Sequence, residues 1–270
     1  MIKGKFTFLG TGNMAGAIIG GITKEYPDDA IAVFDVDESK YDKYKGRSFT
    51  FTHSVKEAVE EGTFIFLSVK PQNFAELLGG IRESGVPLDG KTFISIAAGI
   101  STEYICRLLG RDVPVIRTMP NTPMLAGKGV TALSRNALVA DKVFSAVCKI
   151  FASAGEAFTL PESKMNDIIA VTSSSPAYVF LFIKSIVDGA RELGFDGDNM
   201  LDIVCKTVIG SAELLRTSGK SADEMIRMVC SPKGTTEKAM DALKEGGFEE
   251  SVIDAMKRCT DRANELSSLN

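Results

Sequence analysis

Residues Phe6 to Ala15 read FTFLGTGNMA, a short apolar run followed directly by a GxGxxA turn. Glycines in such a turn allow a tight chain reversal and a close approach of the backbone to a pyrophosphate, and the helix that starts there offers N–H groups to the phosphates. The motif carries weight because it lies at the first strand of an alternating series of strands and helices. We expect it to bind a dinucleotide, the alternative being a purely structural turn. Its residues are Gly10, Thr11, Gly12, Asn13, Met14 and Ala15.

Eight short apolar segments occur in the first 160 or so residues, most of them separated by stretches with helical spacing. Their apolar runs are continuous, as in strands that are buried on both faces of a parallel sheet. Strand–helix–strand repeats form right-handed βαβ units, so we predict a doubly wound α/β sheet of the Rossmann type. The predicted strands are Lys5–Leu9, Ile31–Phe34, Phe49–Thr52, Phe64–Val69, Thr92–Ala97, Val113–Arg117, Val130–Leu133 and Ala157–Leu160.

The sequence changes character after Pro161. From there on the pattern is helical and is broken mainly at glycines, so we divide the chain into a dinucleotide-binding Rossmann domain, residues 1–160, and an all-α domain, residues 161–270. The segment Ala177–Leu193 is apolar around almost its whole circumference, and such a helix must be buried on several sides. A domain of about 110 residues has limited means to surround it, so we expect a second subunit to help cover it.

The composition, with 44% hydrophobic and 24% charged residues, is that of a soluble globular protein. A net charge of −4 without a Lys/Arg-rich block argues against nucleic acid and anionic membranes as partners. The N-terminus leaves no room for a signal peptide, and the apolar run Pro176–Ile183 is too short to span a bilayer. Five scattered cysteines without a CxxC pair argue against a disulfide framework and a metal site. We therefore expect a cytoplasmic protein.

The second predicted strand ends near Asp35, which lies 20 residues after Ala15. At this spacing an acidic side chain accepts hydrogen bonds from the ribose hydroxyls next to the adenine. Its carboxylate repels the 2′-phosphate of NADPH, and the following residue, Val36, carries no positive charge. We therefore predict a preference for NADH over NADPH. The alternative is that Asp35 or Asp37 caps the helix that follows.

Three further stretches are too particular to be ordinary loops. Residues 68–72 read SVKPQ, with Pro71 suited to the first turn of a helix. Residues 117–123 read RTMPNTP, a loop stiffened by two prolines, which suits the positioning of a nicotinamide ring. Its Arg117 either stabilises the loop or contacts a cofactor phosphate. Residues 231–236 read SPKGTT, and the N–H and O–H donors of such a turn at a helix start suit a carboxylate.

These stretches resemble the pyrroline-5-carboxylate reductase family, and the resemblance covers nearly the whole chain. The order and the spacing of the motifs both agree with the family. The motifs are GTGNMA at Gly10–Ala15, VKP at Val69–Pro71, AAGI at Ala97–Ile100, RTMPNTP at Arg117–Pro123, SPAY at Ser175–Tyr178, and SPKGTT at Ser231–Thr236, which is similar to the family's SPGGTT.

The resemblance implies hydride transfer from NADH or NADPH to the C=N bond of 1-pyrroline-5-carboxylate, a cyclic imine acid, giving L-proline in the last step of proline biosynthesis. It also implies a homodimer with interlocked helices, and dimers of this family often assemble into decamers. The substrate carboxylate is then held by Ser231, Gly234, Thr235 and Thr236, with the Thr236 hydroxyl near the imine nitrogen. The nicotinamide pocket is lined by Val69, Lys70, Pro71, Met119, Pro120 and Asn121.

Imine reduction needs orientation, exclusion of water and a proton donor from the protein, since the cofactor carries the chemistry. The single histidine, His53, is expected to be solvated or to cap a helix, so we assign the proton to Thr236 or to a water that it holds. Two alternatives stay open. A dehydrogenase of the 3-hydroxyacid or 6-phosphogluconate type needs an acid–base lysine on the first long helix, where this chain has SPAY and Lys184 two turns further on. The second alternative is a nucleotide-binding regulatory protein, which binds the cofactor but does not convert a substrate.

The chain departs from the family pattern where the family has glycine and this sequence has Ser173, Ser175 and Lys233. A serine held at positive φ is strained by about 1–2 kcal/mol. Lys233 either points to solvent or adds charge near the substrate carboxylate. These departures bear on the exact substrate, including the size of its ring, more than on the reaction type.

Overall fold

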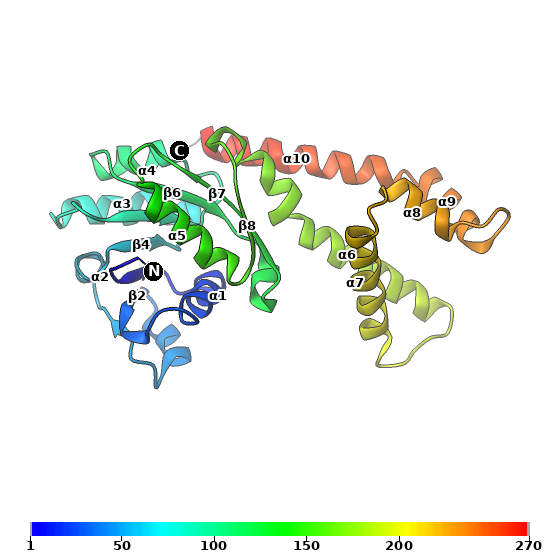
Figure 1. The fold of residues 1–270 in the computed structure, drawn as a ribbon, viewed down its shortest axis with the longest axis horizontal. Helices are drawn as coiled ribbons and strands as arrows, with labels where there is room; N and C mark the ends of the chain where they lie inside the picture. The colour runs from blue at the N-terminus through cyan, green and yellow to red at the C-terminus, as the bar shows by residue number, and fades with distance from the viewer. Residues whose placement is uncertain (1, 269–270) are drawn as a thin grey trace. The chain divides into compact units, whose positions relative to one another are not determined.

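The computed structural model of the protein describes residues 2–268. Its N-terminal part is built on an eight-stranded sheet with the order β3-β2-β1-β4-β5-β6-β7-β8 (Figure 1). Each strand falls on one of the eight predicted segments, so the predicted Rossmann-type sheet is confirmed. The strands are β1 Phe6–Leu9, β2 Ile31–Phe34, β3 Thr50–Phe51, β4 Phe64–Leu67, β5 Thr92–Ser95, β6 Val115–Met119, β7 Gly129–Arg135 and β8 Gly155–Thr159.

Strands β1 to β6 pair in parallel, whereas β6 and β7 pair antiparallel, with Arg117 opposite Ser134. This pair differs from the parallel sheet predicted for the whole series. Only residues 120–128 connect the two strands, and a parallel connection needs a crossover of about a dozen residues or more. The helix α5, Asp141–Ala152, provides such a crossover, and β8 accordingly runs parallel to β7.

Helices cover both faces of the sheet (Figure 1). On one face, α1 (Asn13–Ile22) and α5 pack against side chains that include Phe8 and Phe66, whose rings stack with centroids 4.4 Å apart. The other face carries α2 (Val55–Glu61), α3 (Phe74–Glu83) and α4 (Thr102–Leu109), packed against residues such as Leu9 and Leu67. Successive strand residues therefore enter opposite cores, which explains why the strands are apolar without a break.

Short turns connect these elements, and one of them is unusual. Residues Ile169–Ser173 form η6, a single π-helical turn of a kind that often occurs at functional sites. Met165 and Ile169 pack with Met119 of β6 and with Ala263 near the end of the chain. The 3₁₀ turns are η1 Asp28–Ala30, η2 Glu38–Tyr44, η3 Pro71–Asn73, η4 Thr122–Ala126 and η5 Glu162–Lys164.

The chain divides into two compact units, one that runs to Ser174 and resumes at Cys259, and one that spans Ser175–Arg258. The predicted boundary at residues 160/161 coincides with the end of the strands. The compact unit extends further, to Ser174, because η6 and the end of the last helix pack on the sheet. The described residues after Pro161 contain no strand, as predicted. Their longer helices are α6 Ser175–Glu192, α7 Met200–Ser218, α8 Ala222–Val229, α9 Thr235–Glu245 and α10 Phe248–Ser268.

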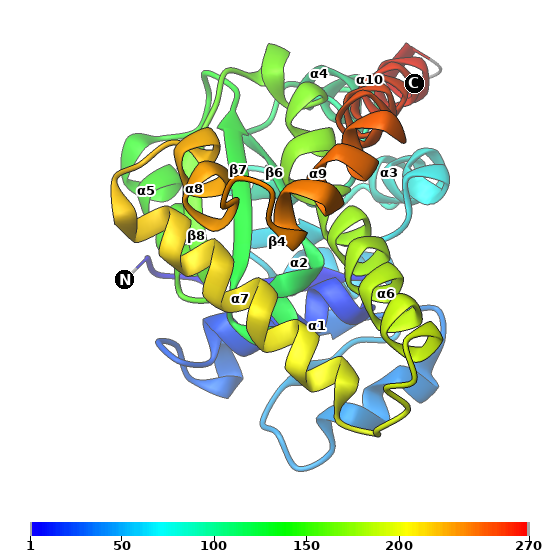
Figure 2. The ribbon, with the colours of Figure 1, turned by 90° about the vertical axis from the view of Figure 1, so that its right-hand side faces the viewer.

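The second unit leaves much of its apolar surface uncovered. Helices α6 and α7 pack against each other (Figure 2), and Phe182 lies 6.3 Å from Phe248 between ring centroids. Yet Phe180 and Leu181 of α6 are 61% and 64% exposed, and Val229 of α8 is 66% exposed. Exposed apolar surface of this extent is typical of a site that a protein partner or a membrane covers.

The helical stretch Ile169–Glu192 is longer than the apolar run Pro176–Ile183 that the sequence indicates. It comprises 24 residues, its most apolar 18-residue segment has a mean hydropathy of 1.3, and only 11% of that segment is buried in the single chain. By length and composition it is able to cross a bilayer. Length and composition alone therefore do not exclude a membrane span, although the core helix of a soluble protein passes the same test.

Candidate active site

The glycine turn brings the ends of three strands together. Gly10 has a φ of +98°, and its N–H donates to the carbonyl of Phe34 at the end of β2 with an N···O distance of 2.8 Å. A Cβ atom at Gly10 would lie 2.8 Å from the backbone oxygen of Ser68, directly after β4. Only glycine combines this φ with such close neighbours. The turn thus lies at the carboxyl edge of the parallel strands, where ligands of open α/β sheets bind.

The predicted ribose-binding carboxylate is well ordered by its neighbours. Asp35 Oδ2 accepts from the N–H of Thr11 at 2.8 Å and from its hydroxyl at 3.0 Å, and Oδ1 accepts from Lys40 Nζ at 2.9 Å. Burial raises the pKa of Asp35, but the hydrogen bonds from Lys40 and Thr11 together outweigh it and hold the pKa below its usual value. The carboxylate is therefore charged at neutral pH. It also accepts from the N–H of Asp37, whereas Asp37 itself caps η2 through the N–H of Ser39.

Lys40 is a partner that the sequence motif did not indicate. It lies five residues after Asp35 on η2, and a second lysine of the same turn, Lys43, donates to the carbonyl of Thr11. Two ammonium groups thus lie around the end of the glycine turn. Val36 is 91% exposed beside them and offers an apolar surface.

The start of α1 is open. Gly12 occupies the N-cap with a φ of −64° and a ψ of −174°, no side chain caps the helix, and its first turn carries no acidic residue. A Cβ atom placed on Gly12 meets nothing within 4 Å. Free N–H groups, the positive end of the helix dipole and an unobstructed approach fit the pyrophosphate of a dinucleotide.

The residues predicted for the nicotinamide pocket lie at the same edge, because β4, β5 and β6 are neighbours in the sheet. Lys70 is exposed at the start of η3, while Val69 is partly buried beneath it. Met119, Pro120 and Asn121 are buried, and Met119 packs in the core with Met165. Their side chains are therefore turned into the protein and expose little surface.

Both polar atoms of the Asn121 amide have hydrogen-bond partners within the protein. Its Oδ1 accepts from the N–H of Val130 at 2.8 Å, and its Nδ2 donates to the carbonyl of Thr172 in η6 at 2.9 Å. Ser173 adds a hydrogen bond from its hydroxyl to the carbonyl of Pro120 at 3.4 Å. The loop after β6 is thus fastened to the π-helical turn.

The predicted carboxylate-binding turn belongs to the other unit, and it too ends in an open helix start. The N–H of Gly234 donates to the carbonyl of Ser231 at 2.9 Å, and Gly234 is the N-cap of α9, which no side chain caps. A Cβ atom at Gly234 would lie 2.4 Å from Ser231 Oγ, so the tight turn requires glycine. Thr235 and Thr236 begin α9 and bring two hydroxyls next to its N–H groups.

Comparison with known proteins decides the family. A family model described as pyrroline-5-carboxylate reductase dimerisation matches residues 162–266, and one described as NADP oxidoreductase, coenzyme F420-dependent, matches residues 5–99. The pyrroline-5-carboxylate reductase of Escherichia coli strain K12 is 34% identical over 270 residues, which cover 97% of this chain and 98% of that protein. The chain belongs to the pyrroline-5-carboxylate reductase family.

Solved structures agree with this membership. A 1-pyrroline-5-carboxylate reductase of Streptococcus pyogenes matches with a TM-score of 0.88 and 30% identity, covering 97% of this chain and 98% of that one. The Plasmodium falciparum pyrroline carboxylate reductase with NADP bound gives a TM-score of 0.90 at 25% identity, covering 99% of both chains. The sequence resemblance is thereby confirmed for family and for fold.

Two of the departures from the family's glycines cause no backbone strain. Ser173 lies in the π-helical turn and Ser175 begins α6. Lys233, with a φ of +60°, is the single non-glycine residue with positive φ in the described part of the chain. The strain considered for the serines is therefore absent, and it falls on Lys233 instead. The N–H of Lys233 donates to Glu237 Oε2 at 2.7 Å, which helps to hold this conformation.

Restoring the family's glycine is expected to have opposite effects at two of these positions. Lys233→Gly removes a left-handed non-glycine residue and should stabilise the protein by about 1 kcal/mol. Ser173→Gly should destabilise it by about 1 kcal/mol, because glycine weakens a helical turn and the bond to Pro120 is lost. Urea denaturation at one fixed protein concentration measures both. If both substitutions stabilised the protein, or both destabilised it, the assigned backbone conformations would be contradicted.

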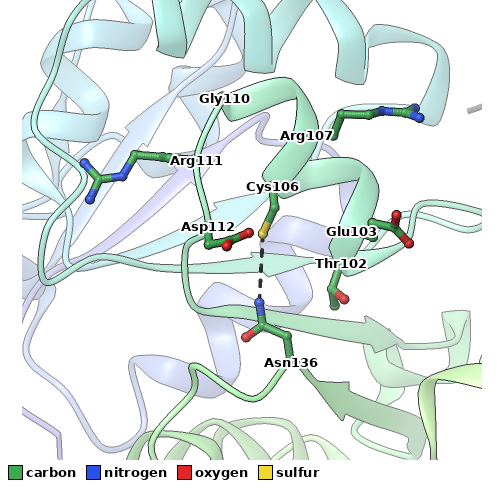
Figure 3. A pocket seen from close by; sticks show the side chains of 8 residues that line it. All are labelled: Thr102, Glu103, Cys106, Arg107, Gly110, Arg111, Asp112 and Asn136. Atoms are coloured by element: carbon green, nitrogen blue, oxygen red, sulfur yellow. Dashed lines mark hydrogen bonds between the residues drawn. The ribbon is translucent and has the colours of Figure 1, made fainter.

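His53 is exposed on the surface and its Nδ1 lies 2.7 Å from Glu38 Oε1, an arrangement that raises the imidazole pKa through the hydrogen bond. A cavity of about 680 Å³ lies beside α4 and is lined in part by Cys106, Arg107 and Asn136, whose side chains are drawn in Figure 3. The Asn136 amide bonds to the backbone of Val115 at the amino end of β6, so this cavity lies at the sheet edge opposite the glycine turn. None of the predicted site residues lines it.

Proposed function

We propose that this protein reduces 1-pyrroline-5-carboxylate to L-proline with NADH or NADPH. The observation that supports the proposal most strongly is the 34% identity to a pyrroline-5-carboxylate reductase along 97% of the chain. The open start of α1 at the carboxyl edge of the sheet supplies the matching dinucleotide site. In the reaction the imine carbon gains a hydride, the imine nitrogen gains a proton, and the C=N double bond becomes a C–N single bond.

Separate groups of residues position the cofactor, hold the substrate and supply the proton. When bound, the reduced nicotinamide supplies the hydride. Val69, Lys70 and Pro71, together with Met119, Pro120 and Asn121, position the ring. Ser231, Gly234, Thr235 and Thr236 hold the substrate carboxylate by their N–H and O–H groups, supported by the dipole of α9. The Thr236 hydroxyl, or a water that it holds, passes a proton to the imine nitrogen.

A substrate comparison tests the function. Purified protein is mixed with NADH and either pyrroline-5-carboxylate or a 3-oxoacid, and loss of the reduced nicotinamide is followed by absorbance. Oxidation with the imine alone supports the proposal, and oxidation with the 3-oxoacid alone supports the dehydrogenase alternative. Binding of NADH without turnover supports a regulatory protein. A panel that includes the six-membered imine acid defines the ring preference.

For the cofactor, the proposal is a preference for NADH over NADPH, supported by the charged carboxylate of Asp35. A 2′-phosphate has to approach this carboxylate, but Lys40 Nζ, 2.9 Å from Oδ1, offsets part of the repulsion. We expect Asp35→Ser to shift the ratio of kcat/KM for NADH to that for NADPH by about 10-fold toward NADPH, equivalent to about 1.4 kcal/mol. Lys40→Met is expected to shift the same ratio the other way.

Lys45 provides a matched control for this pair of substitutions. It lies just beyond the same turn as Lys40 but pairs with Asp42, with both side chains largely exposed. Lys45→Met should leave the ratio of kcat/KM values unchanged. A wild-type protein that strongly prefers NADPH would refute the proposed preference, whatever the variants do.

For assembly, we propose a homodimer formed through the helical unit. The support is the match to the family's dimerisation region at residues 162–266 and the exposed apolar side chains of α6 and α8. On this view the stretch Ile169–Glu192 is an interface helix and not a membrane span, and the protein acts in the cytoplasm. Light scattering coupled to gel filtration distinguishes a dimer from a decamer of five dimers.

A further inference from the structure

A buried arginine lies in β6, next to residues of the proposed nicotinamide pocket. Arg117 of β6 is 3% exposed, its Nη2 donates to Asn166 Oδ1 at 2.6 Å, and its Nη1 lies 3.9 Å from Glu162 Oε1. Its Nε is buried without a hydrogen-bond partner. A guanidinium without full compensation is costly to bury, so stability alone gives a poor account of it. It contacts no open surface, which argues against direct binding of a cofactor phosphate.

One partner of Arg117 fastens the loop after β5. Glu162 Oε1 accepts from the N–H of Thr102 at 2.7 Å, and Oε2 accepts from the Thr102 hydroxyl at 2.6 Å. Thr102 is the first residue of α4, so the end of the loop 96–101 is fixed at this point. The same carboxylate faces the guanidinium of Arg117, which links the loop to β6.

The other partner fastens the middle of that loop through the end of the chain. Asn166 Nδ2 donates to Ser267 Oγ at 2.9 Å and to Asn264 Oδ1 at 3.0 Å. The Ser267 hydroxyl in turn donates to the carbonyl of Gly99 at 3.0 Å. Gly99 has a φ of +73°, and a Cβ there would lie 3.3 Å from Leu266, so the loop and the last turns of α10 lie in close contact.

The guanidinium of Arg117 therefore joins two adjacent loops at the carboxyl edge of the sheet. The loop 96–101 follows β5 and residues 120–121 follow β6, and in this register Ser95 pairs with Arg117. We propose that Arg117 is a positioning residue, which holds these two loops at a fixed spacing against the nicotinamide through Glu162, Asn166 and Ser267. The end of α10 is then part of the scaffold of the active site. This inference rests on the proposed function, which places the nicotinamide at this edge.

Two neighbouring serines allow a matched test. Ser267→Ala removes the bond to the Gly99 carbonyl and the bond from Asn166, whereas Ser268→Ala removes a bond from its hydroxyl to the carbonyl of Glu265 in the same helix. We expect Ser267→Ala to lower kcat about 10-fold, as misplacement of reacting groups does. Ser268→Ala should keep kcat within about twofold, which corresponds to a negligible change of barrier. Ser267→Thr retains a hydroxyl and should restore most of the lost activity.

Affinity measurements separate positioning from a purely structural role. ADP-ribose is the cofactor without its nicotinamide ring, so Ser267→Ala should bind it as the wild type does while binding NADH more weakly. A variant with a lower melting temperature but wild-type kcat and NADH affinity would overturn the proposal. If Arg117→Met and Asn166→Ala fold, the same measurements are made on them. If they do not fold, the variants of Ser267 and Ser268 decide the test. If the wild type fails to turn over pyrroline-5-carboxylate, the proposed function fails, and the comparison of NADH with ADP-ribose still judges the positioning role.

Discussion

Replacing Gly12 with alanine is expected to remove most dinucleotide binding while leaving the folded protein about as stable as before. A Cβ at this position meets nothing within 4 Å, and the φ of −64° is one that alanine adopts freely. The space that the methyl group fills is the space in which the backbone has to approach the pyrophosphate. We expect the Kd for NADH to rise about 100-fold, equivalent to about 2.7 kcal/mol. Fluorescence titration with NADH measures the change.

Stability should hardly change in this variant. Alanine is a poorer N-cap than glycine, but it also restricts the unfolded chain, and the two effects of about 0.5 kcal/mol each oppose one another. Gly10→Ala provides the contrast, because Gly10 has a φ of +98° and its Cβ would lie 2.8 Å from the Ser68 oxygen. This variant should lose about 3 kcal/mol of stability. Gly20→Ala, in open space on α1, controls for substitution itself. Wild-type NADH affinity in Gly12→Ala would refute the assigned turn.

The sheet and its glycine turn were predictable because their causes are local. Phe8 and Leu9 enter opposite cores, so a strand buried on both faces has to be apolar at every position. The conformation of Gly10 follows from the meeting of β1, β2 and β4, which any βαβ unit of this type produces. The direction of β7 was missed because apolar continuity does not distinguish parallel from antiparallel neighbours. The connection comprises only residues 120–128 in the structure, whereas residues 118–129 lie between the predicted strands, and that length is compatible with a parallel crossover.

The roles of several site residues were not predictable because their partners are distant in the sequence. Asn166 lies 49 residues from Arg117, and Ser267 lies 168 residues from Gly99. A motif such as RTMPNTP identifies an important loop but does not say that Met119 and Asn121 turn inward. Lys40 was hidden for a different reason. The 3₁₀ turn η2 brings it back to Asp35, and helical periodicity does not predict that contact.

Loss of the Thr236 hydroxyl is expected to slow the chemical step more than it weakens substrate binding. Thr236→Val keeps the branched shape and removes the proposed proton donor, so we expect kcat to fall about 100-fold, the lower range for general acid catalysis. Ser231→Ala removes the hydrogen bond proposed to hold the substrate carboxylate and should raise KM about 10-fold with kcat largely kept, since a charged hydrogen bond contributes about 1.5–3 kcal/mol. Steady-state kinetics with pyrroline-5-carboxylate resolves the two patterns.

The conservative variant separates the hydroxyl from the shape of the side chain. Thr236→Ser retains the O–H at the second residue of α9, where it remains next to the open helix start, so its kcat should stay within about 10-fold of wild type. Thr236 is only partly buried, and Gly234, not Thr236, sets the geometry of the turn, so neither substitution should unfold α9. Full kcat in Thr236→Val would mean that the proton comes from elsewhere. The chemical step would then depend on orientation of the ring acid by the turn 231–236 and on solvent protons alone.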